Sequence, residues 1–306
     1  MLIIEGIKMD FLNTLINGLS VGGIYAMIAL GYTMVYGIAK MLNFAHGDII
    51  MVGAYVIILF LPINPIVSII AAIVFCAILG IVIEKIAYKP LRGASPLAVL
   101  ITAIGVSYLL QSLAQIIAGP NPKLNTLFES LFPSFYEKYN GIIAIGSFNL
   151  RLSTLITLIC AGIVMIALTL FVKKTRTGRA MVAVSEDKGA AQLMGINVNH
   201  IIMITFAIGS ALAALASTLM MLGGQKFAVT MGSLPGIKAF TAAVIGGIGS
   251  IPGAMLGGIV LGLIECFAQT VPEIAPYTIT IEFSILILVL LVKPTGFLGK
   301  KRREKV

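Results

Sequence analysis

The chain has 306 residues, of which 59% are hydrophobic and only 11% are charged. Because about 25% of the residues in an average soluble domain are charged, this composition excludes a soluble fold and indicates that lipid surrounds much of the chain. The net charge of +9 does not indicate a nucleic-acid partner, since the basic residues lie in separate connecting segments rather than in one patch.

The N-terminal sequence "MLIIEGIKMD" contains neither a basic start nor a small-residue cleavage site, so we expect no removable signal peptide. Apolar runs, most of them near the length of a bilayer core, then follow along the whole chain. They cover residues 11–38, 47–61, 65–83, 97–118, 152–172, 201–222, 236–249, 252–268 and 277–292. The pattern predicts an all-α fold, a polytopic membrane helix bundle of about eight transmembrane segments in one domain.

A polar cluster interrupts the apolar sequence between the first two runs, in "MLNFAHGDIIMVGAY", which contains Asn43, His46 and Asp48. Polar groups at membrane depth need partners, so we interpret this stretch as a break between two helices. Two roles stay open for the three side chains. They cap the helix ends, with Asp48 at the start of the second helix, or they line a polar route through the bundle.

Most of the 21 basic residues lie in three segments, residues 85–95, 173–200 and the tail, 293–306. The positive-inside rule places these segments in the cytoplasm, and the N-terminus and the loop 119–151 outside. Within that loop, two alternating runs around Gly146 and Ser147 predict a β-hairpin with a glycine-first turn. The hairpin is either a docking surface or a cap on the bundle.

The cytoplasmic segment 173–200 contains a short predicted helix. Ser185 is predicted to be its N-cap, with Glu186 and Asp187 in the first turn, where the helix dipole favours acids. Gly195 is predicted to end it in the left-handed conformation. A helix this short needs a partner. It either offers a surface to a soluble motor or rests on the membrane surface.

The runs 236–249 and 252–268 form a pair. The first is too short to cross a bilayer of about 30 Å. The span 201–222 is expected to end outside and the last span, 277–292, to lead inside, so the segment between them must cross the membrane an even number of times. We therefore expect the run 236–249 to enter from outside, turn at membrane depth at "GGIGSIPG" and return. The turn contains Gly246, Gly247, Gly249, Ser250 and Gly253, which either pack helices closely or line a wet cavity. The pattern of residues 35–56 is similar, as in two halves related by internal symmetry.

Few fixed charges are expected within the spans. Glu265 and Glu282 are interpreted as rim residues near the outer interface. Cys76, Cys160 and Cys266 fit no metal or redox spacing, and we assign no metal site.

Several stretches in order along the chain match one family: "GYTMVYGI" followed by "NFAHGD", "GRAMVAVSEDKGAAQLMGINVN", "GIKAFTAAVIGGIGSIPGAMLGG" and "LLVKPTGFLG". They resemble the permeases of branched-chain amino acid ATP-binding cassette (ABC) importers, of the LivH type. The resemblance covers residues 11–299. It implies a permease in the bacterial inner membrane that carries leucine, isoleucine, valine or related amino acids.

The resemblance also implies partners: a second, homologous permease in a heterodimer, two cytoplasmic ATPase subunits and an extracytoplasmic solute-binding protein. The segment 186–195 corresponds to the family's coupling loop. The residues that it implies for ATPase coupling are Gly178, Arg179, Glu186, Asp187, Ala190, Ala191, Gly195 and Ile196.

The chain contains no phosphate-loop motif, so ATP is expected to bind to the partner subunits, and we expect no enzymatic activity, catalytic residue or cofactor in this chain. Two alternatives stay open. One is a related permease for another small solute, such as urea or short amides. The other is an ion-coupled carrier, which the lack of paired acids within the predicted spans argues against.

Overall fold

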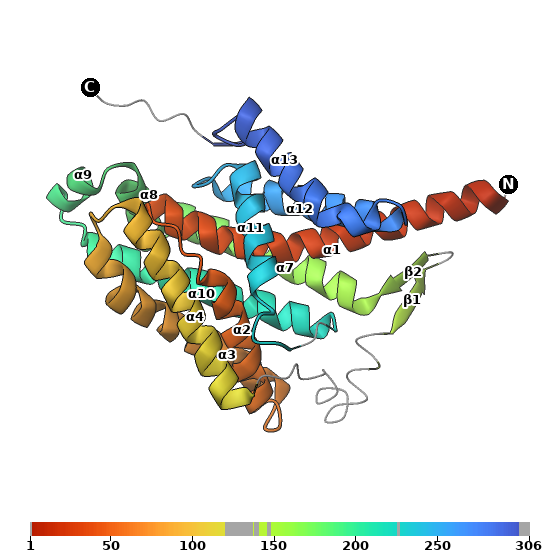
Figure 1. Ribbon diagram of the computed structural model, residues 1–306, viewed down its shortest axis with the longest axis horizontal. Coiled ribbons are helices and arrows are strands. Elements are labelled where there is room, and N and C mark those ends of the chain that lie inside the picture. Colours follow the sequence, from red (N-terminus) through yellow and green to blue (C-terminus); the bar gives the residue numbers. More distant parts are fainter. Residues whose placement is uncertain (1, 120–136, 138–140, 146–147, 225–226, 300–306) are drawn as a thin grey trace.

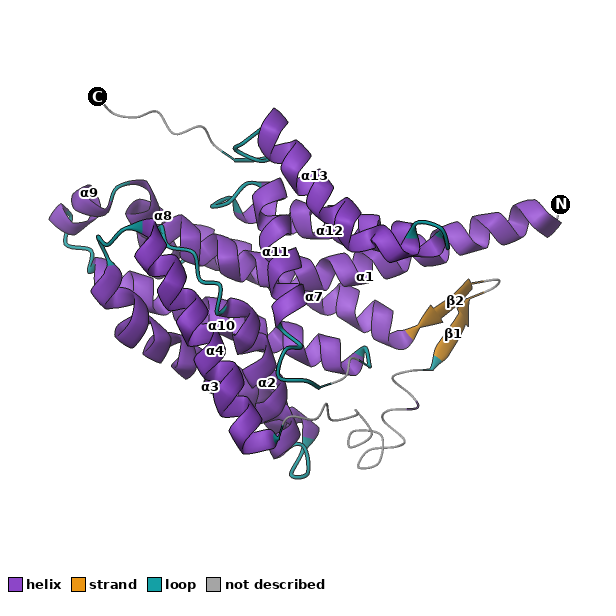
Figure 2. Cartoon of the chain, viewed as in Figure 1, coloured by secondary structure: helices purple, strands orange, loops and turns teal. Residues whose placement is uncertain are grey.

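The computed structural model describes all residues except 1, 120–136, 138–140, 146–147, 225–226 and 300–306. The described part is a bundle of helices with one small hairpin (Figure 2). The expected membrane helix bundle is thus confirmed. The helices of the bundle are α1 (Leu2–Ala39), α2 (His46–Phe60), α3 (Pro65–Ile83), α4 (Pro96–Ala118), α7 (Leu152–Lys174), α10 (Val198–Leu222), α11 (Ser233–Gly246), α12 (Ile251–Thr270) and α13 (Thr278–Val292).

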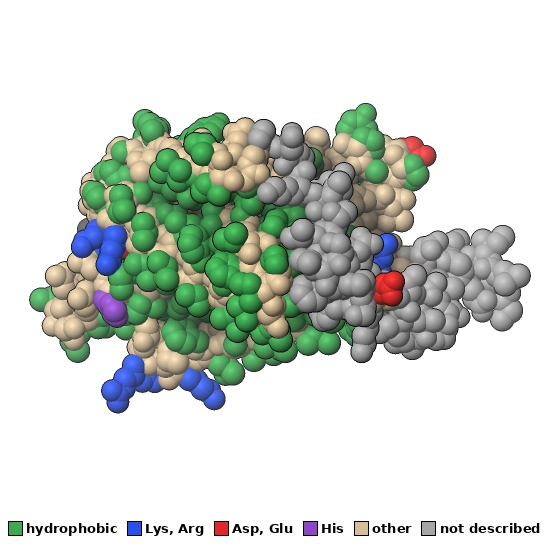
Figure 3. Space-filling model, turned by 90° about the horizontal axis from the view of Figure 1, so that it is seen from below, with side chains coloured by type: hydrophobic (Ala, Val, Ile, Leu, Met, Phe, Trp, Pro, Cys, Tyr) green, Lys and Arg blue, Asp and Glu red, His purple; other side chains and the backbone are tan. Residues whose placement is uncertain are grey.

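Seven helices in the described part are long and apolar enough to cross a membrane, and α2 and α11 are shorter apolar helices of 15 and 14 residues. Two of these seven spans include short turns. The span of α3 continues through a π-helical turn (Glu84–Tyr88) and a 3-10 turn (Lys89–Leu91), and the span of α13 begins with a 3-10 turn (Ala275–Tyr277). On the face seen in Figure 3, hydrophobic side chains are spread over the described middle and most Lys and Arg side chains lie at the left edge, as suits a lipid-facing surface.

Side-chain caps explain where several of these helices begin. Asn64 precedes α3 and accepts a hydrogen bond from the Ile66 amide at 2.8 Å. Ser95 and Asn197 cap α4 and α10 in the same way. Proline follows the cap in α3 and α4, where its missing N–H removes no helical hydrogen bond. Local sequence therefore sets these boundaries.

Glycines let the backbones of α1 and α12 approach closely. The helices run antiparallel, with Gly22 against Gly258 and Gly262. A Cβ atom on Gly262 would collide with the backbone of Gly22, so only glycine fits this contact. Helix α10 packs against α1, α2 and α3 and is buried over much of its length.

The two ends of the bundle differ (Figure 1). At one end, β1 (Ile142–Ile145) pairs antiparallel with β2 (Phe148–Arg151), with Ile145 opposite Phe148. This confirms the predicted hairpin, although its turn residues, 146–147, lie outside the described residues. At the other end lie two short helices, α8 (Arg176–Glu186) and α9 (Lys188–Leu193). We name this the basic end, because Lys40, Arg92, Lys173, Lys188 and Lys293 lie there.

Candidate functional site

The first helix break begins where α1 ends at Ala39. Lys40 follows with a φ of 61°, a left-handed conformation that is uncommon for a residue with a side chain. Its Nζ atom donates a hydrogen bond to the Gly37 carbonyl and so binds a free carbonyl at the helix end. The chain then turns back into the bundle, and Met41, Asn43 and Ala45 are all buried. The predicted break is therefore present.

Helix α2 begins inside the bundle rather than at its surface. The His46 imidazole occupies a notch at Gly31 of α1, where any Cβ atom would collide with the ring, and packs edge-on against Tyr32 at 4.7 Å between ring centroids. Gly31 lies about 12 Å from the end of α1 at 1.5 Å per residue. His46 is 1% exposed, and its Nε2 atom has no hydrogen-bond partner among the described residues.

Asn43 and Asp48 connect the break to neighbouring helices. The Tyr88 hydroxyl donates to Asn43 Oδ1 at 2.8 Å, and Gln111 Nε2 of α4 donates to Asp48 Oδ1, also at 2.8 Å. Among the described residues, no side chain caps the start of α2, although Asp48 does lie in its first turn, as expected. Of the two roles left open, side-chain capping of α2 is therefore not what the structure shows. Buried polar groups need hydrogen-bond partners, and here the partners come from other segments.

A second break precedes α11 and meets the first one. Gly232 and Gly236, at the start of α11, lie directly against Gly47 at the start of α2. A Cβ atom on any of the three glycines would approach the opposing backbone within 3 Å. Two short helices thus meet inside the bundle through their N-terminal ends, which carry the positive ends of the helix dipoles. This arrangement is typical of transporters built from two related halves.

The turn between α11 and α12 lies elsewhere than predicted. Gly247 packs against Thr295 and Gly299, and Gly249 lies near Gly37, two residues before the end of α1. The turn is therefore at the basic end and not at membrane depth. Helix α12, with 20 residues, is long enough to cross by itself. The second break instead ends inside the bundle, where Gly232 at the start of α11 lies against Gly47.

The residues of the turn have structural partners. Gly246 and Gly253 pack backbone against backbone, and Ser250 caps α12 by accepting from the Gly253 amide at 3.2 Å. Gly249 is exposed and borders a small cavity of about 60 Å³ with Ser185. Close packing explains Gly246 and Gly253, and a role of the turn in the translocation path stays a prediction.

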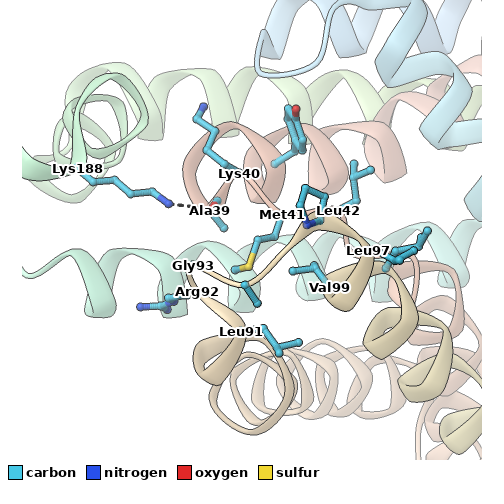
Figure 4. Close-up of a pocket in the computed structure, with 14 residues that line it drawn as sticks. Ala39, Lys40, Met41, Leu42, Leu91, Arg92, Gly93, Leu97, Val99 and Lys188 are labelled. Atoms are coloured by element: carbon cyan, nitrogen blue, oxygen red, sulfur yellow. Dashed lines mark hydrogen bonds between the residues drawn. The ribbon is translucent and has the colours of Figure 1, made fainter.

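A larger cavity of about 610 Å³ lies at the basic end, next to the first break (Figure 4). It is formed by the end of α1, the returning chain and the start of α4. Met41, Leu42, Leu91 and Val99 supply an apolar wall, and its lining also includes Lys40, Arg92 and Lys188. Arg92 is ion-paired to Glu84 and also donates to Asn199, so its guanidinium helps to join the helix ends around the cavity.

The segment 173–200 forms two short helices where one was predicted. Helix α8 ends at Glu186, and Asp187 caps α9 by accepting from the Ala190 amide at 3.0 Å. Ser185 lies within α8 and donates to the Val182 carbonyl, so its predicted capping role is wrong. The sequence allows Glu186 and Asp187 to lie in the first turn after an N-cap. In the structure, however, Asp187 is itself the N-cap, because it adopts the extended backbone that a cap requires. Gly195 is left-handed, with a φ of 81°, as predicted.

The residues expected to couple to an ATPase have different surroundings. Gly178 packs against Phe171 and Val172 without room for a Cβ atom, and Ala191 is buried. Arg179, Glu186, Asp187, Ala190 and Gly195 are exposed, and Ile196 is half-buried. Only the exposed members are available to another subunit.

An unpartnered apolar pair completes this surface. Leu193 and Met194, at the end of α9, are 90% and 82% exposed, which is unusual for large apolar side chains outside the lipid-facing spans. Lys188 of the same helix donates from Nζ to the Ala39 carbonyl at 2.9 Å (dashed line in Figure 4). The exposed segment is thus joined directly to the last residue of α1, where the first break begins.

Sequence reasoning missed a buried ionic cluster. Lys238 of α11 lies 2.7 Å from Glu265 of α12 and 3.2 Å from Glu282 of α13. Glu282 is fully buried and the Glu265 side chain is 12% exposed, so both acids are paired inside the protein and do not form an exposed rim. Lys238 within an apolar run was the available signal, since a basic residue in a span requires acids close by. The paired acids also weaken the argument made against an ion-coupled carrier.

Comparison with known proteins gives one consistent result. Residues 14–292 match a family model described as "Branched-chain amino acid transport system / permease component". The chain is 42% identical to the high-affinity branched-chain amino acid transport system permease protein BraD of Pseudomonas aeruginosa, over 97% of this chain and 98% of that protein. It is 40% identical to LivH of Escherichia coli, over the same shares, and 30% identical to a probable LivH of Methanocaldococcus jannaschii, over 89% and 88%.

Proposed function

Because the chain belongs to the permease family of branched-chain amino acid transport systems, we propose that it translocates leucine, isoleucine, valine or related hydrophobic amino acids into the cytoplasm as the membrane-spanning subunit of an ABC importer. It is a multi-pass inner-membrane protein with a helical bundle. Permeases of such importers work with an ATPase and a binding protein. We assign it two ATPase subunits and a second, homologous permease as its partner in a heterodimer.

The observation that carries the proposal is the connection between the exposed α8–α9 segment and the first helix break. Leu193 and Met194 offer an apolar contact, and Lys188 joins the same helix to Ala39. An ATPase subunit that moves α9 therefore acts on the end of α1 without an intervening element. Hydrolysis belongs to that subunit, and this chain supplies the moving helices.

The sidedness follows from charge. Lys and Arg side chains gather at the end that holds α8 and α9 (Figure 3), so this end faces the cytoplasm by the positive-inside rule. The β1–β2 hairpin and the N-terminus then face outward, where a binding protein delivers solute. The C-terminal segment after α13 lies inside.

The two breaks suit the chemistry of an amino acid. A carboxylate is stabilised by the positive N-terminal ends of α2 and α11, which meet at Gly47 and Gly232. The polar residues Asn43, His46 and Asp48 lie around the same contact, and apolar side chains surround them. We place the translocation path along this contact and the cavity next to it.

Uptake by the reconstituted complex tests the proposal. The chain would be purified with its second permease and ATPase subunits, placed in liposomes and supplied with its binding protein and ATP. We expect uptake of branched-chain amino acids that needs ATP. Uptake of urea or short amides in preference to leucine would select the alternative solute class, and uptake driven by a Na⁺ or proton gradient without ATP would identify an ion-coupled carrier.

A further inference from the structure

A buried charge cluster joins four elements in the C-terminal half of the bundle. Lys238 is 4% exposed and lies between Glu265 and Glu282. Glu265 Oε2 also accepts from the Tyr25 hydroxyl at 2.6 Å, and Gln269 Nε2 donates to Glu265 Oε1 at 3.2 Å. The cluster therefore connects α11 with α1, α12 and α13. It lies outside the helix breaks and the coupling segment.

The hydrogen bonds of the cluster distinguish its two acids. Both oxygens of Glu265 accept hydrogen bonds, from Tyr25 and Gln269, and Lys238 forms an ion pair with Oε1 at 2.7 Å, as suits an ionised carboxylate. Glu282 accepts only from Lys238, and its Oε2 atom has no partner within the described part of the chain. Two carboxylates and one ammonium would leave a net negative charge in a medium of low dielectric constant. The cluster is balanced if Glu282 holds a proton.

Stability alone does not explain such a cluster. Replacing a buried ion pair with well-packed apolar residues is often neutral or stabilising, and ionisable residues within membrane spans are usually functional. Helix α11 has a particular need for fixed contacts, because it is short and its N-terminal end meets Gly47 of α2 through Gly232 and Gly236. Near its other end, the Phe297 and Leu298 amides donate to the Ile245 and Gly246 carbonyls.

The contacts of α11 with α12 and α13 differ in kind from its contact with α2. Helix α11 is held to α12 by an ion pair, to α13 by a charged hydrogen bond, and to the segment after α13 by backbone hydrogen bonds. Its contact with α2, at Gly47, Gly232 and Gly236, is backbone against backbone. A contact made by glycines can slide or separate with little loss of side-chain interaction.

We propose that Lys238 is a positioning residue which, through an ionised Glu265 and a protonated Glu282, locks α11 to α12 and α13, so that these helices move as one body against α2 during transport. The inference rests on the proposed function. In this inference, the relative movement takes place at the glycine contact between α11 and α2. Lys238 ensures that the start of α11 moves together with α12 and α13.

The test compares the same substitution at the two acids in the complete reconstituted complex. The measurement is the amount of leucine transported per ATP hydrolysed, for equal amounts of assembled complex. Glu282→Gln replaces a neutral carboxyl group with a neutral amide, so the ratio should stay within about twofold of the wild type. Glu265→Gln removes the ionised partner of Lys238, so the ratio should fall at least about tenfold.

Two further measurements exclude a purely structural role. The double variant Lys238→Met, Glu265→Gln has no unpaired charge and should assemble normally, yet its transport ratio should still fall. Infrared spectra of the wild-type complex should contain a carbonyl band of a protonated carboxylic acid that the Glu282→Gln variant lacks.

Equal effects of the two single substitutions, a wild-type ratio in the double variant, or an unchanged carboxylic acid band would each overturn the inference. A wild-type complex that hydrolyses ATP but carries no branched-chain amino acid would instead contradict the proposed function, and the infrared result would still decide the protonation of Glu282.

Discussion

Lys188 of α9 and Ala39, the last residue of α1, are joined by a hydrogen bond of 2.9 Å although 149 positions separate them in the sequence. The ammonium group of Lys188 lies where the free carbonyls and the negative dipole end of α1 favour a cation. The returning chain begins at the next residue, Lys40. The exposed segment and the helix break are thus mechanically adjacent.

Lys188→Met should therefore reduce the coupling of ATP hydrolysis to transport. The substitution keeps the length and apolar stem of the side chain but removes the charged donor. We expect transport per ATP hydrolysed to fall about threefold or more, because a hydrogen bond from a charged group contributes on the order of 1 kcal/mol when it is partly exposed. Lys173→Met, at an exposed position in the last turn of α7, is the matched control and should leave the ratio unchanged.

Gly47→Ala should disrupt the contact between the two short helices. The added Cβ atom would meet the Gly232 carbonyl, and overpacking of this kind costs about 1–3 kcal/mol. We expect a lower midpoint of thermal unfolding in detergent and a loss of uptake. Gly105→Ala in α4 is the control, because no atom lies within 4 Å of its added Cβ and alanine favours the helix. Similar losses in both variants would refute the role of this contact.

Much of the architecture could be predicted because lipid imposes a strong pattern on sequence. Each apolar run became a helix with ends close to those expected, except that α1 begins at Leu2 and not near residue 11, and the short α11 was recognised from its length. The hairpin was found from alternation around two turn residues. These features depend on local sequence and on the thickness of a bilayer, so they can be recognised in a single sequence.

The errors came from contacts between distant residues. Lys238 and Glu282 are 44 positions apart, and only the packing of α11 on α13 brings them together. In the same way, the hydrogen-bond partner of Asn43 is Tyr88, which lies 45 positions away, so the sequence pattern alone suggested a helix cap. The turn at Gly247 was placed at membrane depth because composition does not indicate which of two glycine-rich stretches lies inside the bundle.

The N-cap of α9 gives a direct comparison between Asp187 and Ser185. Asp187→Ala removes the side chain that holds the start of α9, and the loss of an N-cap costs about 1 kcal/mol. Because Leu193 and Met194 are presented by this short helix, we expect a weaker response of the ATPase to the binding protein. Ser185→Ala should have little effect on the same measurement, since Ser185 does not cap α9. The opposite order of effects would favour the cap predicted from the sequence.

Gln111 and Gln115 lie on the same helix, α4, but Gln111 binds Asp48 whereas Gln115 is exposed, so the same substitution at the two positions tests the contact with Asp48. Gln111→Leu removes the amide donor to Asp48, so a buried carboxylate loses one of its hydrogen bonds, which costs about 2 kcal/mol. Helix α4 is otherwise loosely packed, with little of its length buried, so this contact is important for holding it against α2. We expect a lower unfolding midpoint and reduced uptake. Gln115→Leu, at an exposed position one turn later, should keep both values or raise the midpoint, because leucine suits a lipid-facing position. Equal stability of the two variants would show that Asp48 does not depend on Gln111.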